Sequence, residues 1–133
     1  MLDFIKDSSH NVTSSSSWGN YKNSDTYKVY RGSLSSEYGL TWSAADTTNG
    51  SDVTKGILLT TGATERNSSK NIYDVAGNCE EWTTEAYNTD KRVIRGGSYG
   101  SYGSNYPASG RDRYYPTFIS LNTSFRPLLY VAL

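Results

Sequence analysis

The chain has 133 residues and a formal net charge of zero, with 13 basic and 13 acidic side chains. A chain of this length forms one domain with a single core, here residues 1–133. The balanced charge excludes the broad positive field that binding to a phosphate backbone requires, so we expect no nucleic-acid partner. Only 35% of the residues are hydrophobic, while tyrosine, serine, threonine, asparagine and glycine abound. This composition favours strands and loops over helices.

The sequence contains no apolar run long enough to cross a bilayer, so we expect no membrane insertion. Residues 1–6 lack the basic start and the apolar centre of a signal peptide. Cys79 is the only cysteine, which excludes an internal disulfide and leaves the redox compartment open.

The N-terminal part of the chain, residues 1–55, is the less regular part. Apolar residues alternate with charges in Met1–Lys6, which predicts the last turns of an amphipathic helix. Thr26–Arg31 alternates enough to predict a short strand, which Gly32 closes.

Residues 56–133 carry clearer elements and form the core part of the domain. Gly56–Gly62 is a short apolar run between glycines, which predicts a buried strand or a buried turn. Arg92–Arg95 predicts a strand that stops at two glycines, and Phe125–Leu133 predicts a terminal strand. Pro127 is expected at the start or edge of that strand, where a missing N–H is tolerated.

A long segment, about residues 99–123, separates the last two predicted strands and is rich in glycine, serine, tyrosine and asparagine. A loop of this length in a compact domain is usually functional or disordered. Six of the 12 tyrosines follow Gly97, and aromatic residues favour ordered packing. We therefore predict an ordered, functional segment.

Three blocks stand out in the second half of the chain: Asn71–Thr83, Arg95–Ser98 and Ser124–Pro127. In this order they resemble the C-terminal half of the formylglycine-generating-enzyme (sulfatase-modifying-factor) family. The resemblance covers about residues 56–133 and implies an α+β, C-type-lectin-like fold of short strands and long irregular loops. Because members of that family carry helices and strands further upstream, it also implies a chain trimmed at its N-terminus.

The densest group of motif residues is Asp74, Gly77, Asn78, Glu81 and Trp82. In some enzymes of the resembled family, the positions that match Asn78 and Glu81 bind calcium through oxygen atoms. A structural interpretation is preferred, in which Trp82 fills the core, Gly77 permits a tight turn and the polar side chains bind turn amides. We therefore expect no metal site.

The other two blocks also favour structural roles. Arg95–Ser98 predicts a strand end at which two backbones pack closely, since a lone pair of glycines is weak evidence for an anion-binding loop. Arg126 is expected to tie the final strand to this region through hydrogen bonds to carbonyls or to a carboxylate.

No catalytic constellation is found, so we expect no enzyme and no cofactor. The resemblance associates oxidase chemistry with two C-terminal cysteines that bind copper, and no cysteine follows Trp82. Cys79 lies inside the turn motif, where a buried thiol is usually inert. His10 lies in a serine-rich segment without an orienting partner, and no second carboxylate cluster accompanies Glu80–Glu85.

The segment at residues 99–123 has the composition of a binding surface. Tyrosine and phenylalanine supply large contact area at low rotamer cost, and serine and asparagine supply adaptable hydrogen bonds, as in antibody loops. Arg111 and Arg113 flank Asp112 and add charged anchors. The predicted ligand-binding residues are Tyr99, Ser101, Tyr102, Ser104, Asn105, Tyr106, Gly110, Asp112, Arg113, Tyr114, Tyr115, Phe118, Ser120 and Asn122.

The residue types that are missing from the end of the chain support this interpretation. From Gly96 to Leu133 there is no Lys, Glu, Gln, Trp or Met, although Lys, Glu and Trp together occur 14 times before Gly96. Codons ending in a pyrimidine cannot encode these five types. Diversity-generating retroelements produce such a restricted alphabet, and the chain resembles their variable proteins. The alternative is that glycine- and tyrosine-rich loops simply avoid Lys and Glu.

These observations predict a non-catalytic receptor-recognition domain with a hypervariable surface. The expected partner is a protein or glycan on a host or target cell, with oligomerisation left open. Two locations are expected by resemblance, a phage tail on the virion or a bacterial cell surface or secreted protein, and the lack of a signal-like start favours a phage or prophage origin. The alternatives are a formylglycine-generating-type oxidoreductase relative and a structural virion or surface decoration protein.

Overall fold

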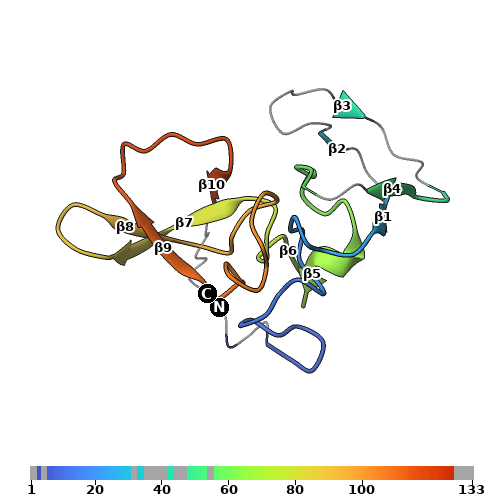
Figure 1. Ribbon diagram of the computed structural model, residues 1–133, viewed down its shortest axis with the longest axis horizontal. Coiled ribbons are helices and arrows are strands. Elements are labelled where there is room, and N and C mark those ends of the chain that lie inside the picture. Colours follow the sequence, from blue (N-terminus) through green and yellow to red (C-terminus); the bar gives the residue numbers. More distant parts are fainter. Residues whose placement is uncertain are drawn as a thin grey trace, which may run out of the picture.

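The computed structural model describes residues 3, 6–30, 33–34, 42–43, 48–53 and 56–127. Figure 1 shows a four-stranded sheet at one end of the molecule, together with three two-stranded ribbons and long connecting loops. In chain order the elements are β1 (Tyr27–Val29), β2 (Ser33–Leu34), β3 (Trp42–Ser43), β4 (Ser51–Val53), the 3-10 helix η1 (Glu65–Asn67), β5 (Ser68–Ser69), β6 (Ile72–Tyr73), β7 (Glu80–Ala86), β8 (Arg92–Arg95), β9 (Arg111–Tyr114) and β10 (Thr123–Phe125).

The expectation of an α+β, C-type-lectin-like fold is wrong. Within the described ranges the chain forms short strands and a single turn of 3-10 helix, which make a small β-rich domain. The abundant glycine, serine, asparagine and β-favouring residues explain the scarcity of helix. The turn expected at Met1–Lys6 falls outside the described residues, apart from Asp3 and Lys6. In the described part of the chain, no helix has the length and apolar character needed to cross a bilayer.

The largest sheet has the strand order β10-β7-β8-β9, in which β10 runs parallel to β7 and the other pairs are antiparallel. The strand predicted at Arg92–Arg95 is confirmed as β8. The terminal strand, β10, begins at Thr123 rather than at Phe125. Pro127 follows this strand instead of starting it, as expected for a residue without an N–H to donate. The remainder of the predicted terminal strand lies outside the described residues.

The ribbons pair β1 with β4, β2 with β3, and β5 with β6, all antiparallel. The strand predicted at Thr26–Arg31 is confirmed by β1, which covers its middle. Of the two structures predicted for Gly56–Gly62, the buried turn is observed. Leu59 is 3% exposed and lies in no named strand, and Ala63 N donates to Thr60 O over 3.1 Å.

The main core is the larger of the two core clusters in the described part of the chain. It forms between the N-terminal segment, as we call residues 6–24, and the motif block, as we call Asn71–Thr83. Its buried members are Val12, Trp18, Tyr21, Val75, Ala76 and Ala108. Val93 and Ile94 of β8 are also fully buried. The prediction that Trp82 fills the core is wrong, because this residue of β7 is only half-buried. Trp18 lies in the core instead, with its indole N–H donating to Asn11 O over 3.0 Å. Segments far apart in sequence therefore share one core.

Candidate functional site

A parallel bridge between Asn20 and Gly77 fixes the turn at the centre of the Asn71–Thr83 block. Asn20 N donates to Ala76 O over 3.1 Å, and Asn78 N donates to Asn20 O over 2.8 Å. Gly77 has a φ of 73°, and a Cβ there would overlap the backbone of Asn20. The prediction that Gly77 permits a tight turn is confirmed.

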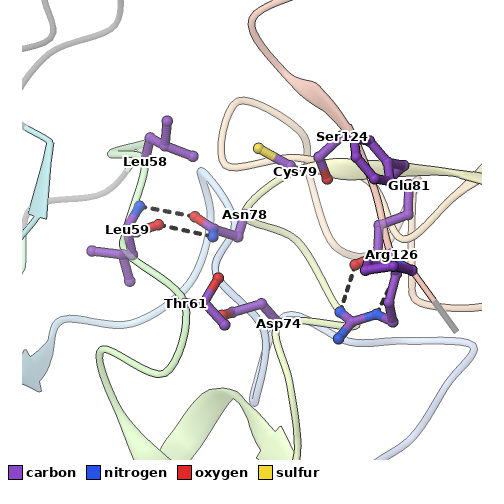
Figure 2. A pocket seen from close by; sticks show the side chains of 11 residues that line it. Leu58, Leu59, Thr61, Asp74, Asn78, Cys79, Glu81, Ser124 and Arg126 are labelled. Carbon is purple, nitrogen blue, oxygen red and sulfur yellow. Dashed lines mark hydrogen bonds and ion pairs between the residues drawn. The ribbon is translucent and has the colours of Figure 1, made fainter. Parts of the chain in front are cut away.

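The side chain of Asn78 pairs with a neighbouring backbone as a strand would. Figure 2 shows its amide lying against Leu59. Asn78 Nδ2 donates to Leu59 O over 3.0 Å, and Asn78 Oδ1 accepts from Leu59 N over 2.8 Å. The same oxygen accepts from Asn20 Nδ2 over 3.0 Å. Protein donors therefore occupy the oxygen that a calcium ion would need, which supports the structural interpretation of Asn78.

Arg126 joins the end of the chain to the motif block. Its guanidinium faces Glu81 in Figure 2, donating from Nε to Glu81 Oε2 over 3.1 Å and from Nη2 to Glu81 Oε1. Nη2 also donates to Tyr73 O over 2.8 Å. The prediction that Arg126 ties the final strand to carbonyls or to a carboxylate is confirmed, and both kinds of acceptor are used.

Two backbones pack closely at Arg95–Ser98, as predicted. Gly97 has a φ of 63°, a left-handed conformation that favours glycine, and a Cβ there would overlap Tyr106 O. Tyr21 contributes a hydrogen bond from its hydroxyl to Gly96 O over 2.7 Å. These contacts hold the end of β8 against the loop that follows it.

One hollow, which we call the motif hollow, lies beside these contacts (Figure 2) and has a volume of about 390 Å³. It is lined by Leu58, Leu59, Thr61, Asp74, Asn78, Cys79, Glu81, Ser124, Phe125, Arg126 and Pro127. Among the described residues, no three His, Cys, Asp or Glu side chains are grouped so that they could hold a metal ion.

Two ionisable groups of the motif hollow, Asp74 and Cys79, have raised pKa values. Burial raises the pKa of the Asp74 carboxyl, although a hydrogen bond from Gly62 N opposes this rise. Burial, and then the nearby Glu81 and Asp74, raise the pKa of the Cys79 thiol to about 11. At neutral pH Cys79 is therefore a thiol rather than a nucleophilic thiolate.

Another hollow, which we call the aromatic hollow, has a volume of about 450 Å³. Its walls come from the start of β7, the loop after β8, β9, and the loop between β9 and β10. It is lined by Glu80, Ser98, Gly100, Ser101, Tyr102, Tyr106, Asp112, Tyr114, Phe118, Ser120 and Asn122. Tyr114 and Phe118 stack with ring centroids 4.1 Å apart and planes inclined by 10°.

The alternation of β9 decides which of its side chains face the aromatic hollow. Successive residues of a strand point to opposite faces of the sheet. Asp112 and Tyr114 line the hollow and are half-buried, whereas Arg111 and Arg113 are exposed on the other face. There both guanidinium groups lie over the ring of Tyr87, at 5.1 Å and 4.9 Å from its centroid.

The segment that supplies most of the aromatic hollow is fixed at both of its ends to the motif block. At one end Tyr99 N donates to Asn78 O over 2.9 Å, and at the other Glu80 N donates to Asn122 O over 2.8 Å. The ends of residues 99–122 therefore meet on either side of Cys79.

The loop after β8 is also bound to the N-terminal segment. Ala108 N donates to Ser15 Oγ over 3.0 Å, and Gly103 N donates to Asn23 Oδ1 over 2.9 Å. Ser15 N in turn donates to Gly103 O over 3.2 Å. The loop is thus extensively hydrogen-bonded, in agreement with the order predicted from its tyrosines.

The predicted ligand-binding residues fall into two groups. Those that line the aromatic hollow are Ser101, Tyr102, Tyr106, Asp112, Tyr114, Phe118, Ser120 and Asn122. The others lie elsewhere: Tyr99 is only 5% exposed, Ser104 and Asn105 are exposed, and Gly110 lies at a turn. Arg113 and Tyr115 are exposed beyond the hollow, where Lys91 lies 4.8 Å from the centroid of the Tyr115 ring.

Sequence reasoning missed Glu80, Ser98 and Gly100, which also line the hollow. One available signal for Glu80 was its departure from the motif of the resembled family, which usually has tryptophan there. With an acidic residue in place of a large apolar one, the start of β7 contributes a carboxylate to the aromatic hollow.

The aromatic hollow contains two acidic side chains, Glu80 and Asp112. Burial, and then the neighbouring Asp112, raise the pKa of Glu80 to about 6. Burial, followed by the charges of Asp112 and Glu80, raises the pKa of Tyr114. None of the described residues that line the hollow is basic.

Fold and site define a small β-rich domain in which a hydrogen-bonded motif block supports a polar, aromatic-lined hollow. The chain belongs to the sulfatase-modifying factor enzyme 1-like domain family, whose family model matches residues 17–129. The matched range begins well upstream of residue 56 and includes Trp18 and Tyr21 of the core. Comparisons with curated proteins and with solved structures found no match.

Proposed function

We propose that the chain is a non-catalytic recognition domain that binds a ligand in the aromatic hollow. One observation is the main support for this proposal. The stretch from Gly96 onward contains no Lys, Glu, Gln, Trp or Met, and apart from Glu80 every residue lining the hollow comes from that stretch. A restricted set of side chains therefore gathers where a ligand would lie.

The chemistry of these side chains suits recognition. Tyr102, Tyr106, Tyr114 and Phe118 offer large surfaces with few rotatable bonds, and serine and asparagine residues between them offer hydrogen bonds. Because the segment is already bonded to Asn78–Glu80 and to the N-terminal segment, binding would order little additional chain.

The absence of catalysis in this proposal rests on the state of Cys79. This single cysteine is half-buried in the motif hollow and has a raised pKa, so it would be a poor nucleophile or metal ligand at neutral pH. The oxidase chemistry of the resembled enzymes is associated with two cysteines, a pair that this chain does not contain.

The restricted alphabet further suggests that a retroelement diversifies this surface in a phage or prophage gene. Such a protein would recognise a protein or glycan on a host cell from a phage tail, or act at a bacterial surface. Sibling gene copies should then differ at those residues lining the hollow that belong to the segment 99–122. Tyr99 should stay fixed because it is buried, and Gly110 because a Cβ there would approach Pro107 O to 2.8 Å.

Binding can be tested on an array of bacterial surface proteins and an array of bacterial glycans, with the purified full chain as the probe. Replacing Tyr114 and Phe118 together by serine should weaken binding to any array target at least about tenfold, because the stacked pair is lost. The matched control replaces Ser104 and Asn105 by alanine on the same segment outside the hollow. Equal binding by the two double variants, both shown to be folded by circular dichroism, would contradict the proposal.

Diversification has a separate test. The gene should be accompanied by a near-identical template repeat and a reverse-transcriptase gene, with adenine-dependent differences confined to codons for residues 99–122. Substitutions spread evenly over the whole gene would overturn this part of the proposal.

A further inference from the structure

The aromatic hollow contains two carboxylates without a basic group among its described lining residues. Glu80 at the start of β7 and Asp112 in β9 lie on the same side of the large sheet. The Glu80 side chain makes no hydrogen bond or ion pair with any other described residue. Asp112 accepts from Arg113 N over 2.8 Å, while the guanidinium of Arg113 is 3.9 Å away. Among the residues that the structure describes, the Glu80 carboxylate therefore has no ion-pair partner.

The other arginines near this sheet are engaged elsewhere. Arg95 and Arg111 each donate to Glu85 over 2.8 Å on the opposite face of β8 and β9. Arg111 and Arg113 also lie over Tyr87. Arg92 of β8, the register partner of Tyr114, donates to Asn88 O and Lys91 O. The described lining of the hollow thus contains carboxylates, aromatic rings and neutral polar groups, and no basic side chain.

Aromatic rings and carboxylates together attract one class of ligand. The face of a tyrosine or phenylalanine ring carries negative potential and attracts ammonium and guanidinium groups, most strongly where water is excluded. Tyr102 and Tyr106 are 50% and 44% exposed, so their rings are accessible from the hollow. A carboxylate beside such rings adds a charge-assisted hydrogen bond.

The surroundings of the hollow favour a protein as the source of that cation. Ile119 and Leu121 are 93% and 66% exposed, on the loop that forms one wall. Such exposed apolar side chains are typical of protein interfaces. A partner protein could cover them, whereas an isolated sugar would leave them in water.

We infer that the aromatic hollow binds the side chain of a lysine or arginine on a partner protein, with Glu80 and Asp112 as its anionic contacts. This inference rests on the recognition function proposed above and specifies the chemical group recognised. The cation would lie between the two carboxylates and against the stacked Tyr114 and Phe118.

The state of Glu80 gives the binding a pH dependence. The acidic groups that face Glu80 are Asp112 and Tyr114 from β9 and Tyr106 from the loop after β8. Arg95 and Arg111 line a small cavity that Glu80 also borders, and both are paired with Glu85. With a pKa raised to about 6, Glu80 is ionised at pH 7 and mostly protonated at pH 5. Affinity for a cation should therefore fall as the pH decreases from 7 to 5.

The experiment is an NMR titration of the full chain with the N-acetyl amides of arginine and lysine, and with the citrulline derivative as the neutral isostere of arginine. Binding of a single side chain should be weak, in the millimolar range. The amide signals of residues 98–122 should shift with arginine and lysine, and citrulline should bind about tenfold more weakly. Glucosamine and its neutral derivative N-acetylglucosamine form the second pair of probes, which tests whether the cation could come from an amino sugar instead.

Variants then assign the contacts. Glu80→Gln and Asp112→Asn should each weaken arginine binding about tenfold, and Glu80→Gln should also remove the change between pH 5 and pH 7. Glu85→Gln is the matched control, because it removes the same charge from the opposite face of the sheet and should leave binding unchanged. If one variant fails to fold, the other and the wild-type pH profile still test the inference.

Three outcomes would overturn it: equal binding of arginine and citrulline, binding of glucosamine but not of the amino-acid amides, or equal effects of Glu80→Gln and Glu85→Gln. Each can occur while Tyr114 and Phe118 remain necessary for binding to an array target, which would leave the recognition function standing. Unchanged array binding by that double variant would instead overturn the recognition function.

Discussion

At the scale of single residues, the motif block is stabilised by polar side chains that replace backbone pairing. Asn78 pairs with Leu59, and Arg126 bonds both to Glu81 and to Tyr73 O. These are hydrogen bonds between groups that are mostly removed from water, where an unpaired partner costs more than in an exposed pair. The stability of the motif block therefore depends on a few side chains.

Arg126 provides the clearest test at this scale. Replacing it by methionine keeps much of the side-chain length but leaves Glu81 and Tyr73 O without their donor. We expect the free energy of unfolding to fall by about 2–3 kcal/mol, measured by urea denaturation. Arg113→Met, on the exposed face of β9, is the control and should change it by less than about 1 kcal/mol. Equal effects of the two substitutions would contradict the structural role of Arg126.

At the scale of elements, the loop after β8 is the feature that depends most on distant contacts. Its backbone bonds to Ser15 and Asn23, residues of a serine-rich segment that looked like a simple polar linker in the sequence. Ser15 is fully buried, and its hydroxyl also donates to Asn11 O over 3.1 Å. The loop and the N-terminal segment should therefore open together.

Ser15→Ala should loosen the loop without disrupting the sheet. Ala108 N–H loses its acceptor, so its hydrogen exchange should become faster, and stability should fall by about 1–2 kcal/mol. Exchange in β7 and β8 should follow only the global loss of stability. Ser104→Ala, an exposed change in the same loop, should alter neither the hydrogen exchange of Ala108 nor the stability. Unchanged protection of Ala108 in Ser15→Ala would show that the loop does not need this anchor.

The elements show which parts of the fold the sequence could predict. β1 and β8 followed from local alternation and from flanking glycines, and the roles of Gly77 and Arg126 followed from their chemistry. The sequence could not show which side of β9 faces the aromatic hollow, since that depends on pairing with β8. The burial of Tyr99, which was predicted to bind a ligand, could not be foreseen either, because this loop residue is held against Asn78, distant in sequence. The helices implied by resemblance had no support in the local composition, and the structure lacks them in its described part.

At the scale of the whole molecule, the main core joins the N-terminal segment to the motif block in the middle of the chain. Val12, Trp18 and Tyr21 pack against Val75 and Ala76. The sequence did not reveal this, because Trp18 and Tyr21 are isolated aromatics among polar residues without any periodicity. The family match from residue 17 agrees with the structure on this point.

A fragment of residues 56–133 should consequently be unable to fold alone. It retains the three motif blocks but loses the N-terminal half of the main core, including the hydroxyl of Tyr21 that bonds Gly96 O. We expect a spectrum without ordered structure in circular dichroism and no cooperative transition in urea, whereas the full chain shows both. A cooperative transition in the fragment would show that the N-terminal segment is dispensable.

The two hydrogen bonds that fix Tyr99 and Asn122 to Asn78 and Glu80 have a consequence for the length of the segment between them. Since the ends are already joined at its base, inserting residues at Ile119, which is 93% exposed, would chiefly change the closure entropy of the loop. That cost grows slowly, by about 0.6 kcal/mol for each doubling of length. The domain could therefore accommodate segments that differ in length as well as in composition, while the motif block below them stays the same.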